Sequence, residues 1–249
     1  MHSTTDHTTS EQRDPHCLAP GAAPALLAGT PWRRLLVMGD SIAAGDGDPV
    51  PGYADRSWAH RLADALRQVE ATTAYLNLGV RGLRTAEIRE QQMDAATQFA
   101  PDLAVVSAGA NDMLRRSFHP AAIEPDLEAI VGSLSDAGCL VVTFGLLDLS
   151  RTSFVPDAMR SDLAGRLRTL NDLVRRVTER HDGIHVDYFD HPALDDQLFS
   201  ADMVHPNRRG HACIFAWLVR ALAGAFPGHP TASRVGEGPG KTPRGSLAS

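Results

Sequence analysis

The sequence predicts an α/β protein whose parallel sheet is covered by helices on both faces. Two observations lead to this fold class. Five short, nearly continuous apolar runs occur along the chain, and a glycine closes each of the first four. Stretches with apolar residues at helical spacing separate these runs. Continuous apolar runs are typical of strands that are buried on both faces, and their alternation with helices indicates a parallel sheet.

Each element can be justified in chain order. The predicted strands are residues 35–38, 75–78, 103–107, 139–144 and 184–186. Apolar residues three and four positions apart predict helices over 58–69, 127–134 and 163–177, and a further helix is expected to begin at Thr85. The last helix is predicted to start near Pro206, because a proline at the first helical position loses no hydrogen bond, and to run through Leu222.

The chain of 249 residues is long enough for one well-buried domain. We expect this domain to span residues 32–227. Residues 1–31 are predicted to be a flexible N-terminal extension, since the Ala-rich stretch before Thr30 is broken by Pro20 and Pro24. Residues 228–249 are rich in Gly, Pro, Ser and Arg without periodicity, which predicts a disordered tail.

Composition excludes several function classes. Apolar residues make up 43% and charged residues 22% of the chain, and no apolar run approaches the ~18 residues that span a bilayer, so no membrane anchor is expected. The net charge of −6 offers no basic face to nucleic acid. Three cysteines and the lack of a secretory signal pattern predict a cytoplasmic protein without a disulfide framework. Nothing in the sequence specifies an oligomeric state.

Four short blocks carry the residue types that ester hydrolysis needs. Three of them follow predicted strands: Gly39-Asp40-Ser41, Gly79, and the loop Gly109 to Asp112. The fourth, Asp202 to Pro206, precedes the last helix. Together they supply a nucleophilic hydroxyl, donors for an oxyanion, and a histidine base with a carboxylate partner. Because loops at the carboxyl ends of parallel strands converge, one site is expected there.

Each block taken alone has a simpler interpretation. Ser41 and Asn111 both fit helix caps, and Gly79 fits a turn that ends a strand. His205 is one of 11 histidines, although Asp202 three positions earlier could hold its Nδ1 while Nε2 faces a serine. The occurrence of all four blocks in order, at strand ends, favours catalysis over these alternatives.

With these blocks the chain resembles the SGNH (GDSL) hydrolases, a family named after the Ser, Gly, Asn and His of its four motifs. The similarity runs from about Arg33 to about Ala223. It is strongest to compact intracellular bacterial members of the esterase or lysophospholipase-like type. The resemblance implies a flavodoxin-like three-layer α/β/α sandwich with a five-stranded parallel sheet.

The resemblance also implies a role for each motif residue. Ser41 would be the nucleophile, His205 the base and Asp202 the carboxylate that orients it. The backbone N–H groups of Ser41 and Gly79 and the side chain of Asn111 would form the oxyanion hole. The implied activity is hydrolysis of a small-molecule carboxylic ester through an acyl-enzyme, with neither a metal nor a cofactor. Acyl transfer to an alcohol or sugar, carbohydrate deacetylation and a non-catalytic binding role remain alternatives.

Residues around the predicted site suggest how a substrate would be held. The segment from Gly45 to Arg56 is expected to form one wall of the cleft. Phe118, the run 146–149 and Phe154 are candidates for an apolar acyl pocket. A second, weaker possibility is that four arginines after strand ends receive an anionic substrate: Arg81, Arg84, Arg115 and Arg116.

Overall fold

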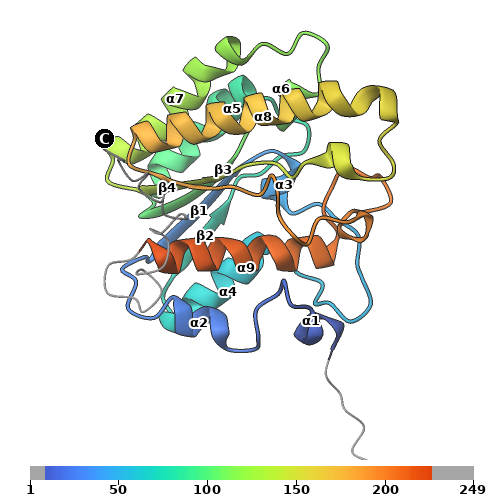
Figure 1. Cartoon of the computed structure of the whole chain (residues 1–249). Coiled ribbons are helices and arrows are strands. Elements are labelled where there is room, and N and C mark those ends of the chain that lie inside the picture. Colours follow the sequence, from blue (N-terminus) through green and yellow to red (C-terminus); the bar gives the residue numbers. More distant parts are fainter. Residues whose placement is uncertain (1–8, 226–249) are drawn as a thin grey trace, which may run out of the picture.

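The computed structural model describes residues 9–225 and confirms the three-layer α/β/α architecture (Figure 1). Its centre is a five-stranded parallel sheet in the order β2-β1-β3-β4-β5. The strands are β1 (Arg34–Gly39), β2 (Ala74–Asn77), β3 (Leu103–Ser107), β4 (Leu140–Phe144) and β5 (Ile184–Val186). These bounds lie within one residue of the predicted ones, because the apolar runs are short and glycines follow them closely.

Two layers of helices cover the sheet. One face carries α2 (Ala22–Leu26), α4 (Trp58–Val69) and α9 (Arg208–Gly224), which lie below the sheet in Figure 1. The other face carries α5 (Thr85–Phe99), α7 (Pro120–Asp136) and α8 (Asp157–Arg180). The remaining short elements are α1 (Ser10–Arg13), α3 (Ser41–Ala44), α6 (Ala110–Met113), η1 (Leu149–Arg151) and η2 (Asp196–Leu198).

Alternation along the strands divides the core into two clusters. Leu35 and Val37 of β1 point toward α4 and α9, whereas Leu36 and Met38 point toward α5 and α7. All four side chains are fully buried. Successive strand residues face opposite sides of a sheet, so a run that is apolar at every position fits only a sheet covered twice. The continuous apolar runs in the sequence therefore predict a helical layer on each face of the sheet.

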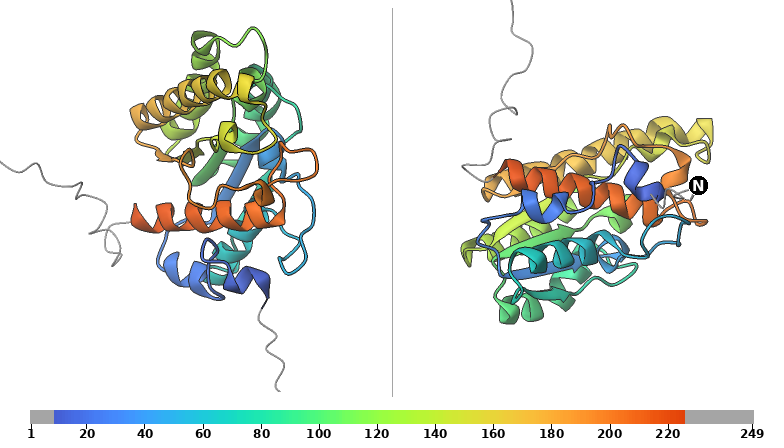
Figure 2. Two further views of the ribbon diagram at one scale, coloured as in Figure 1. Left: turned by 45° about the vertical axis from the view of Figure 1, so that its right-hand side comes forward. Right: turned by 90° about the horizontal axis from the view of Figure 1, so that it is seen from below.

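The N-terminal segment differs from its prediction. Residues 9–31 are folded against the domain rather than flexible, and Figure 2 shows them running beneath α9 and α4. Leu27 is completely buried, and Arg61 of α4 makes a two-pronged ion pair with Glu11 at 2.6 and 2.9 Å. The small helix α1 precedes both prolines that had suggested an unstructured chain, and α2 contains one of them, Pro24, in its first turn. Residues 1–8 and the predicted tail at 228–249 lie outside the described residues.

The strand order places a topological switch point between β1 and β3. The chain leaves β1 for β2 on one side and later returns to β3 on the other side of β1. Loops after β1 and β3 therefore diverge, and ligands bind in the crevice that this leaves at the carboxyl ends. Gly39 at the end of β1 is paired with Ser107 at the end of β3, so the two loops start side by side before they separate.

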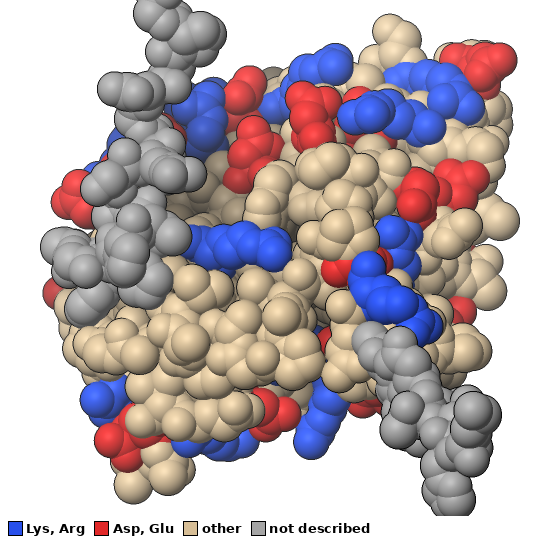
Figure 3. Space-filling view, turned by 60° about the horizontal axis from the view of Figure 1, so that its bottom comes forward, with Lys and Arg blue, Asp and Glu red and all other residues tan. Residues whose placement is uncertain are grey.

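Surface properties agree with the composition. No helix within residues 9–225 is long and apolar enough to cross a membrane. On the face shown in Figure 3, acidic and basic side chains are interspersed. This mixture does not favour a polyanionic partner on that face.

Candidate active site

The end of β1 is shaped by contacts that only glycine allows. Gly39 has φ +136°, and a Cβ there would lie 1.9 Å from the carbonyl oxygen of Ser107. The carboxamide of Gln92 bonds both backbone groups of Gly39, at 2.8 and 2.9 Å. The backbone thus turns sharply and rigidly at the point where the nucleophile follows. Gln92 was missed by sequence analysis, although a polar residue between Ile88 and Ala96 on the buried stripe of α5 was a usable signal.

Asp40 caps the short helix α3 that begins with Ser41. Its Oδ1 accepts from the Ile42 N–H at 3.0 Å and from the Ser107 hydroxyl at 3.1 Å. Its Oδ2 is the one buried side-chain oxygen or nitrogen in residues 9–225 without a hydrogen-bond partner. Burial raises the pKa of Asp40 to about 6, against the lowering effect of the two hydrogen bonds.

The segment that carries His205 is a loop closed on itself. Ser200 N–H donates to the His205 carbonyl at 2.8 Å, and Phe199 forms an isolated antiparallel bridge with Pro206. The next helix begins at Arg208, not at Pro206, because Asn207 is its cap: the Asn207 Oδ1 accepts from the N–H groups of residues 209 and 210. The prediction placed the helix start two residues early. A capping asparagine directly after the proline was the better signal.

Ser41, His205 and Asp202 form a continuous hydrogen-bonded chain. The Ser41 Oγ lies 2.8 Å from His205 Nε2, and His205 Nδ1 lies 2.6 Å from Asp202 Oδ2. Ser41 and His205 are buried, at 6% and 7% exposure, whereas the Asp202 side chain is 40% exposed. The arrangement has the geometry of a base held in the tautomer that accepts the serine proton.

The carboxylate of Asp202 is fixed on both oxygens. Its Oδ1 accepts from the backbone N–H groups of Val204 and His205, each at 3.0 Å, while Oδ2 accepts from the imidazole. Partial burial raises the pKa of Asp202, but these hydrogen bonds lower it more, so the net pKa lies well below the ordinary value. Asp202 is therefore ionised at neutral pH and able to stabilise a protonated imidazole.

Two of the expected oxyanion donors are free to act. Within residues 9–225 the Ser41 N–H, at the start of α3, has no acceptor within hydrogen-bonding distance. The Asn111 Nδ2 donates one hydrogen to the Leu83 carbonyl at 2.9 Å, which leaves its second hydrogen available. Asn111 lies in the helix α6, rather than in an open loop as predicted.

Gly79 has a different environment from the one expected. Its N–H donates to the Asn77 side chain at 2.8 Å, so this N–H is already engaged within its own loop. A Cβ on Gly79 would lie 2.2 Å from the Ala44 nitrogen, which shows close packing against α3. In the same loop the Gly82 N–H has no acceptor in the described chain, and no atom lies within 4 Å of where a Cβ would stand. Gly82, to which sequence analysis assigned no role, thus has an open backbone donor, as does Arg81 beside it.

An apolar hollow of about 60 Å³ adjoins the hydrogen-bonded chain. It is bordered by Ile42 beside the nucleophile and by Val204 and Pro206 beside the histidine. Its other lining residues come from the end of β4 and the segment after it, from the residues that follow β5 and η2, and from α9: Phe144, Gly145, Leu146, Leu147, Leu149, Tyr188, Phe199 and Ile214. Of the predicted acyl-pocket residues, those in the run after β4 line it, whereas Phe118 and Phe154 pack in other clusters.

The loop from Gly45 to Arg56 holds the histidine segment in place. Asp48 N–H donates to the Ser200 hydroxyl, and the Asp48 carboxylate accepts from Ala201 N–H. Below it, His211 bonds the Asp46 carbonyl through Nε2 and accepts from Trp58 N–H through Nδ1. The segment predicted to be a cleft wall is therefore also a brace between the nucleophile and the base.

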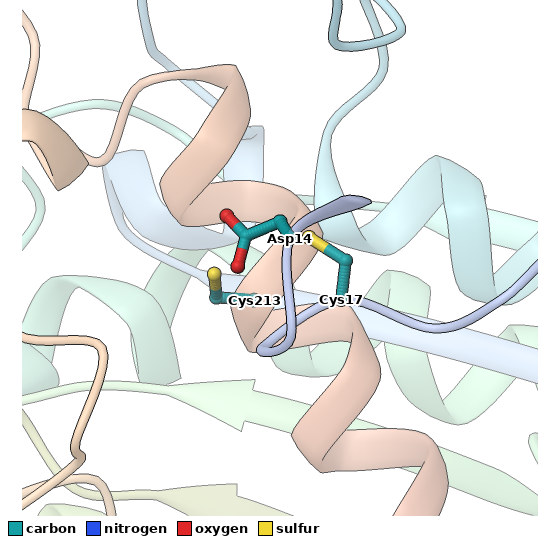
Figure 4. A group of neighbouring side chains, drawn as sticks. All are labelled: Asp14, Cys17 and Cys213. Carbon is teal, nitrogen blue, oxygen red and sulfur yellow. The ribbon is translucent and has the colours of Figure 1, made fainter. Parts of the chain in front are cut away.

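The candidate cation-binding group within residues 9–225 lies away from this site. Asp14, Cys17 and Cys213 have ligand atoms within 4.8 Å of one another, and Figure 4 shows their side chains gathered between the N-terminal segment and α9. The Asp14 Oδ2, however, already accepts from Arg209 and Tyr53, each at 2.8 Å. An arginine cation on the carboxylate disfavours a metal there, so the group is better explained as packing of the N-terminal segment.

An α/β fold with a serine, a histidine and an aspartate joined by hydrogen bonds at its switch point has the geometry typical of serine hydrolases. The model of the GDSL-like lipase/acylhydrolase family matches residues 37–213, more than half of the chain, so the protein belongs to this family. An arylesterase from Vibrio mimicus is 33% identical to this chain over 109 aligned residues, which make up 44% of this chain and 52% of that protein. This chain thus spans about half the length of that relative.

Several solved structures share the fold. LAE5, an alpha/beta hydrolase enzyme from the metagenome of Lake Arreo, has a TM-score of 0.62 at 20% identity, covering 78% of this chain and 95% of LAE5. Axe2, an acetylxylan esterase from Geobacillus stearothermophilus, has a TM-score of 0.60 at 18% identity, covering 78% and 94%. The lipase/acylhydrolase from Enterococcus faecalis has a TM-score of 0.59 at 21% identity, covering 77% and 96%.

Proposed function

We propose that this chain hydrolyses carboxylic esters, that Ser41, His205 and Asp202 perform the reaction, and that the substrate carries a short acyl group. The chain of hydrogen bonds at 2.8 and 2.6 Å is the observation that carries this proposal. Two similar structures give it further support. They are described as catalytic mutants of Axe2: in one an aspartate is replaced by alanine, and in the other a histidine three positions later is, the same spacing as Asp202 and His205.

The reaction proceeds in two steps. His205 Nε2 accepts the Ser41 proton as Oγ attacks the ester carbonyl, and the imidazolium is stabilised by the Asp202 carboxylate. The oxyanion receives hydrogen bonds from Ser41 N–H, from the free hydrogen of Asn111 and from the backbone of the Gly79 to Gly82 loop. The imidazolium then protonates the departing alcohol. Water, deprotonated by the same histidine, releases the acyl group from Ser41.

Within that loop the geometry favours Gly82 over Gly79 as the backbone donor. The Gly79 N–H would have to exchange its bond to Asn77 for one to the oxyanion, whereas the Gly82 N–H has no bond to give up. A preorganised donor costs no reorganisation when charge develops.

The size of the apolar hollow supports a short acyl group. Its volume of about 60 Å³ is far below the ~300–1,000 Å³ of pockets that enclose larger ligands. Acetyl esters are therefore the first substrates to test, including acetylated sugars, since Axe2 is described as an acetylxylan esterase. The free thiols of all three cysteines support the proposed cytoplasmic location.

Hydrolysis of p-nitrophenyl esters from acetate to decanoate tests both parts. We expect the highest kcat/KM for acetate or propionate and no burst or turnover in a folded Ser41→Ala variant. Equal rates across the series would refute the short-acyl assignment, and a fully active Ser41→Ala variant would refute the nucleophile.

A further inference from the structure

Arg81, in the loop after β2, contacts two other loops of the site. Its Nη1 lies 3.0 Å from the Asp46 Oδ2, in the segment that follows the nucleophile helix. Its Nη2 lies 3.5 Å from the Asp202 Oδ2 and 3.5 Å from the His205 Nδ1. One guanidinium therefore touches the segments that carry the nucleophile, the base and the orienting carboxylate.

The contact between Arg81 and Asp202 differs in origin from the other contacts of the Asp202 carboxylate. The other hydrogen bonds to its carboxylate come from its own segment, from Val204 and His205. Among residues 9–225, Arg81 is the one partner of that carboxylate from elsewhere in the fold. The segment is otherwise exposed at its tip, where Met203 adopts φ +58° and is 51% accessible.

Charges alternate along this group. Asp46 is negative, Arg81 positive and Asp202 negative, and His205 becomes positive when it accepts the serine proton. The Arg81 Nη2 and the His205 Nδ1 both carry hydrogens, so the 3.5 Å between them is no hydrogen bond, and both point at Asp202. Asp46 offsets the repulsion that an unpaired arginine would exert on the imidazolium.

We propose that Arg81 is a positioning residue of the esterase, which bridges Asp46 to Asp202 and thereby keeps His205 aligned with Ser41. The inference rests on the catalytic roles proposed above for Ser41, Asp202 and His205. The bridge explains why Arg81 pairs with two carboxylates. Because these two negative charges offset its positive charge, Arg81 is poorly suited to attract an anionic substrate.

The expected effect is on turnover rather than on substrate binding. Arg81 is 62% exposed, so its ion pairs contribute little to stability. A small misplacement of a catalytic group, however, costs far more in rate than the contact itself contributes to folding. We expect Arg81→Ala to lower kcat about tenfold with KM within about twofold of wild type. Arg81→Lys should recover part of the loss, and millimolar free guanidinium should restore activity to Arg81→Ala.

A double-mutant cycle with Asp46 tests the bridge directly. Kinetics with p-nitrophenyl acetate are measured for wild type, Arg81→Ala, Asp46→Ala and the double variant. If Arg81 acts through Asp46, adding Arg81→Ala to the Asp46→Ala variant should lower kcat less than about fivefold, against the tenfold loss expected in wild type. Arg84→Ala is the matched control, since Arg84 lies in the same loop but pairs with Glu87. Thermal unfolding verifies folding, and Arg81→Gln replaces an alanine variant that does not fold.

The outcomes separate this inference from the catalytic assignment. An active wild type, an inactive Ser41→Ala variant and an Arg81→Ala variant with unchanged kcat would overturn the positioning role alone. A change in KM without a change in kcat, or an equal loss in Arg84→Ala, would also overturn it. Full activity in Ser41→Ala would instead overturn the proposed site.

Discussion

The most direct consequence of the site geometry concerns Asp202→Asn. The Asp202 Oδ1 accepts from two backbone N–H groups, and Oδ2 accepts from the imidazole. An asparagine has one oxygen and one NH₂ group to place in these positions. If its oxygen keeps the two backbone bonds, the NH₂ group faces His205 Nδ1. The imidazole then carries its proton on Nε2, where it cannot accept the proton of Ser41.

The reversed amide is no better. Its oxygen would meet Nδ1, but its NH₂ group would oppose the N–H groups of Val204 and His205, so two hydrogen bonds in the segment would be lost. Either way the base is disabled while the volume of the side chain is unchanged. From comparable aspartate-to-asparagine changes in serine hydrolases, we expect kcat to fall on the order of 10³–10⁴-fold, or about 4–5.5 kcal/mol in activation free energy.

The assay is steady-state hydrolysis of p-nitrophenyl acetate, with circular dichroism to verify folding. Asp172→Asn is the matched control, because Asp172 is an exposed ion-pair partner of Arg175 on α8, which covers the face of the sheet opposite to α9 (Figure 1). We expect the control to retain wild-type kcat. An Asp202→Asn variant with more than a tenth of wild-type kcat would refute the assigned role of this carboxylate.

Three further predictions concern the surroundings of the nucleophile. Asn111→Ala removes an oxyanion donor, so kcat should fall on the order of 10²-fold or more, and a normal value with intact thermal stability would contradict the assignment. Gly79→Ala should unfold at clearly lower temperature than Gly82→Ala, because its Cβ meets the Ala44 nitrogen at 2.2 Å whereas Gly82 has free space but φ +84°. For Asp40, the raised pKa of about 6 means that the folded state keeps a proton that the unfolded chain releases near pH 4. Wild-type stability relative to Asp40→Asn should thus fall by at most about 3 kcal/mol as pH rises from 4 to 6, as urea unfolding would show; a constant difference would contradict it.

The strands and the triad could be predicted because their signals are local. Five runs of apolar residues closed by glycine give the strands directly, and alternation along β1 gives both covered faces. Asp202 lies three positions before His205, and this short separation lets its carboxylate reach the Nδ1 of the histidine. The contact between His205 and Ser41, which are 164 positions apart, could be predicted because loops converge at the ends of parallel strands.

Other features depend on contacts that the sequence does not encode locally. The N-terminal segment looked unstructured because its two helices are short and Pro24 lies inside α2, yet Arg61 pairs with Glu11, and Cys17 is buried in a cluster with Ala212 and Cys213 of α9. The sequence alone does not distinguish Gly79 from Gly82 as an oxyanion donor. The position of the Asn77 side chain in the structure shows that the Gly79 N–H already makes a hydrogen bond. The pairing of Arg81 with Asp46 and Asp202 likewise needs three loops in place.

The central claim is that Ser41 attacks the ester and carries the acyl group. Mixing the enzyme with a slowly hydrolysed p-nitrophenyl ester, quenching in acid and mapping the peptides by mass spectrometry tests it most directly. The account predicts one added acyl group, located on Ser41 and absent from the Ser41→Ala variant. Turnover with the acyl group on another residue, or with an unmodified enzyme whose Ser41→Ala variant is equally active, would contradict it.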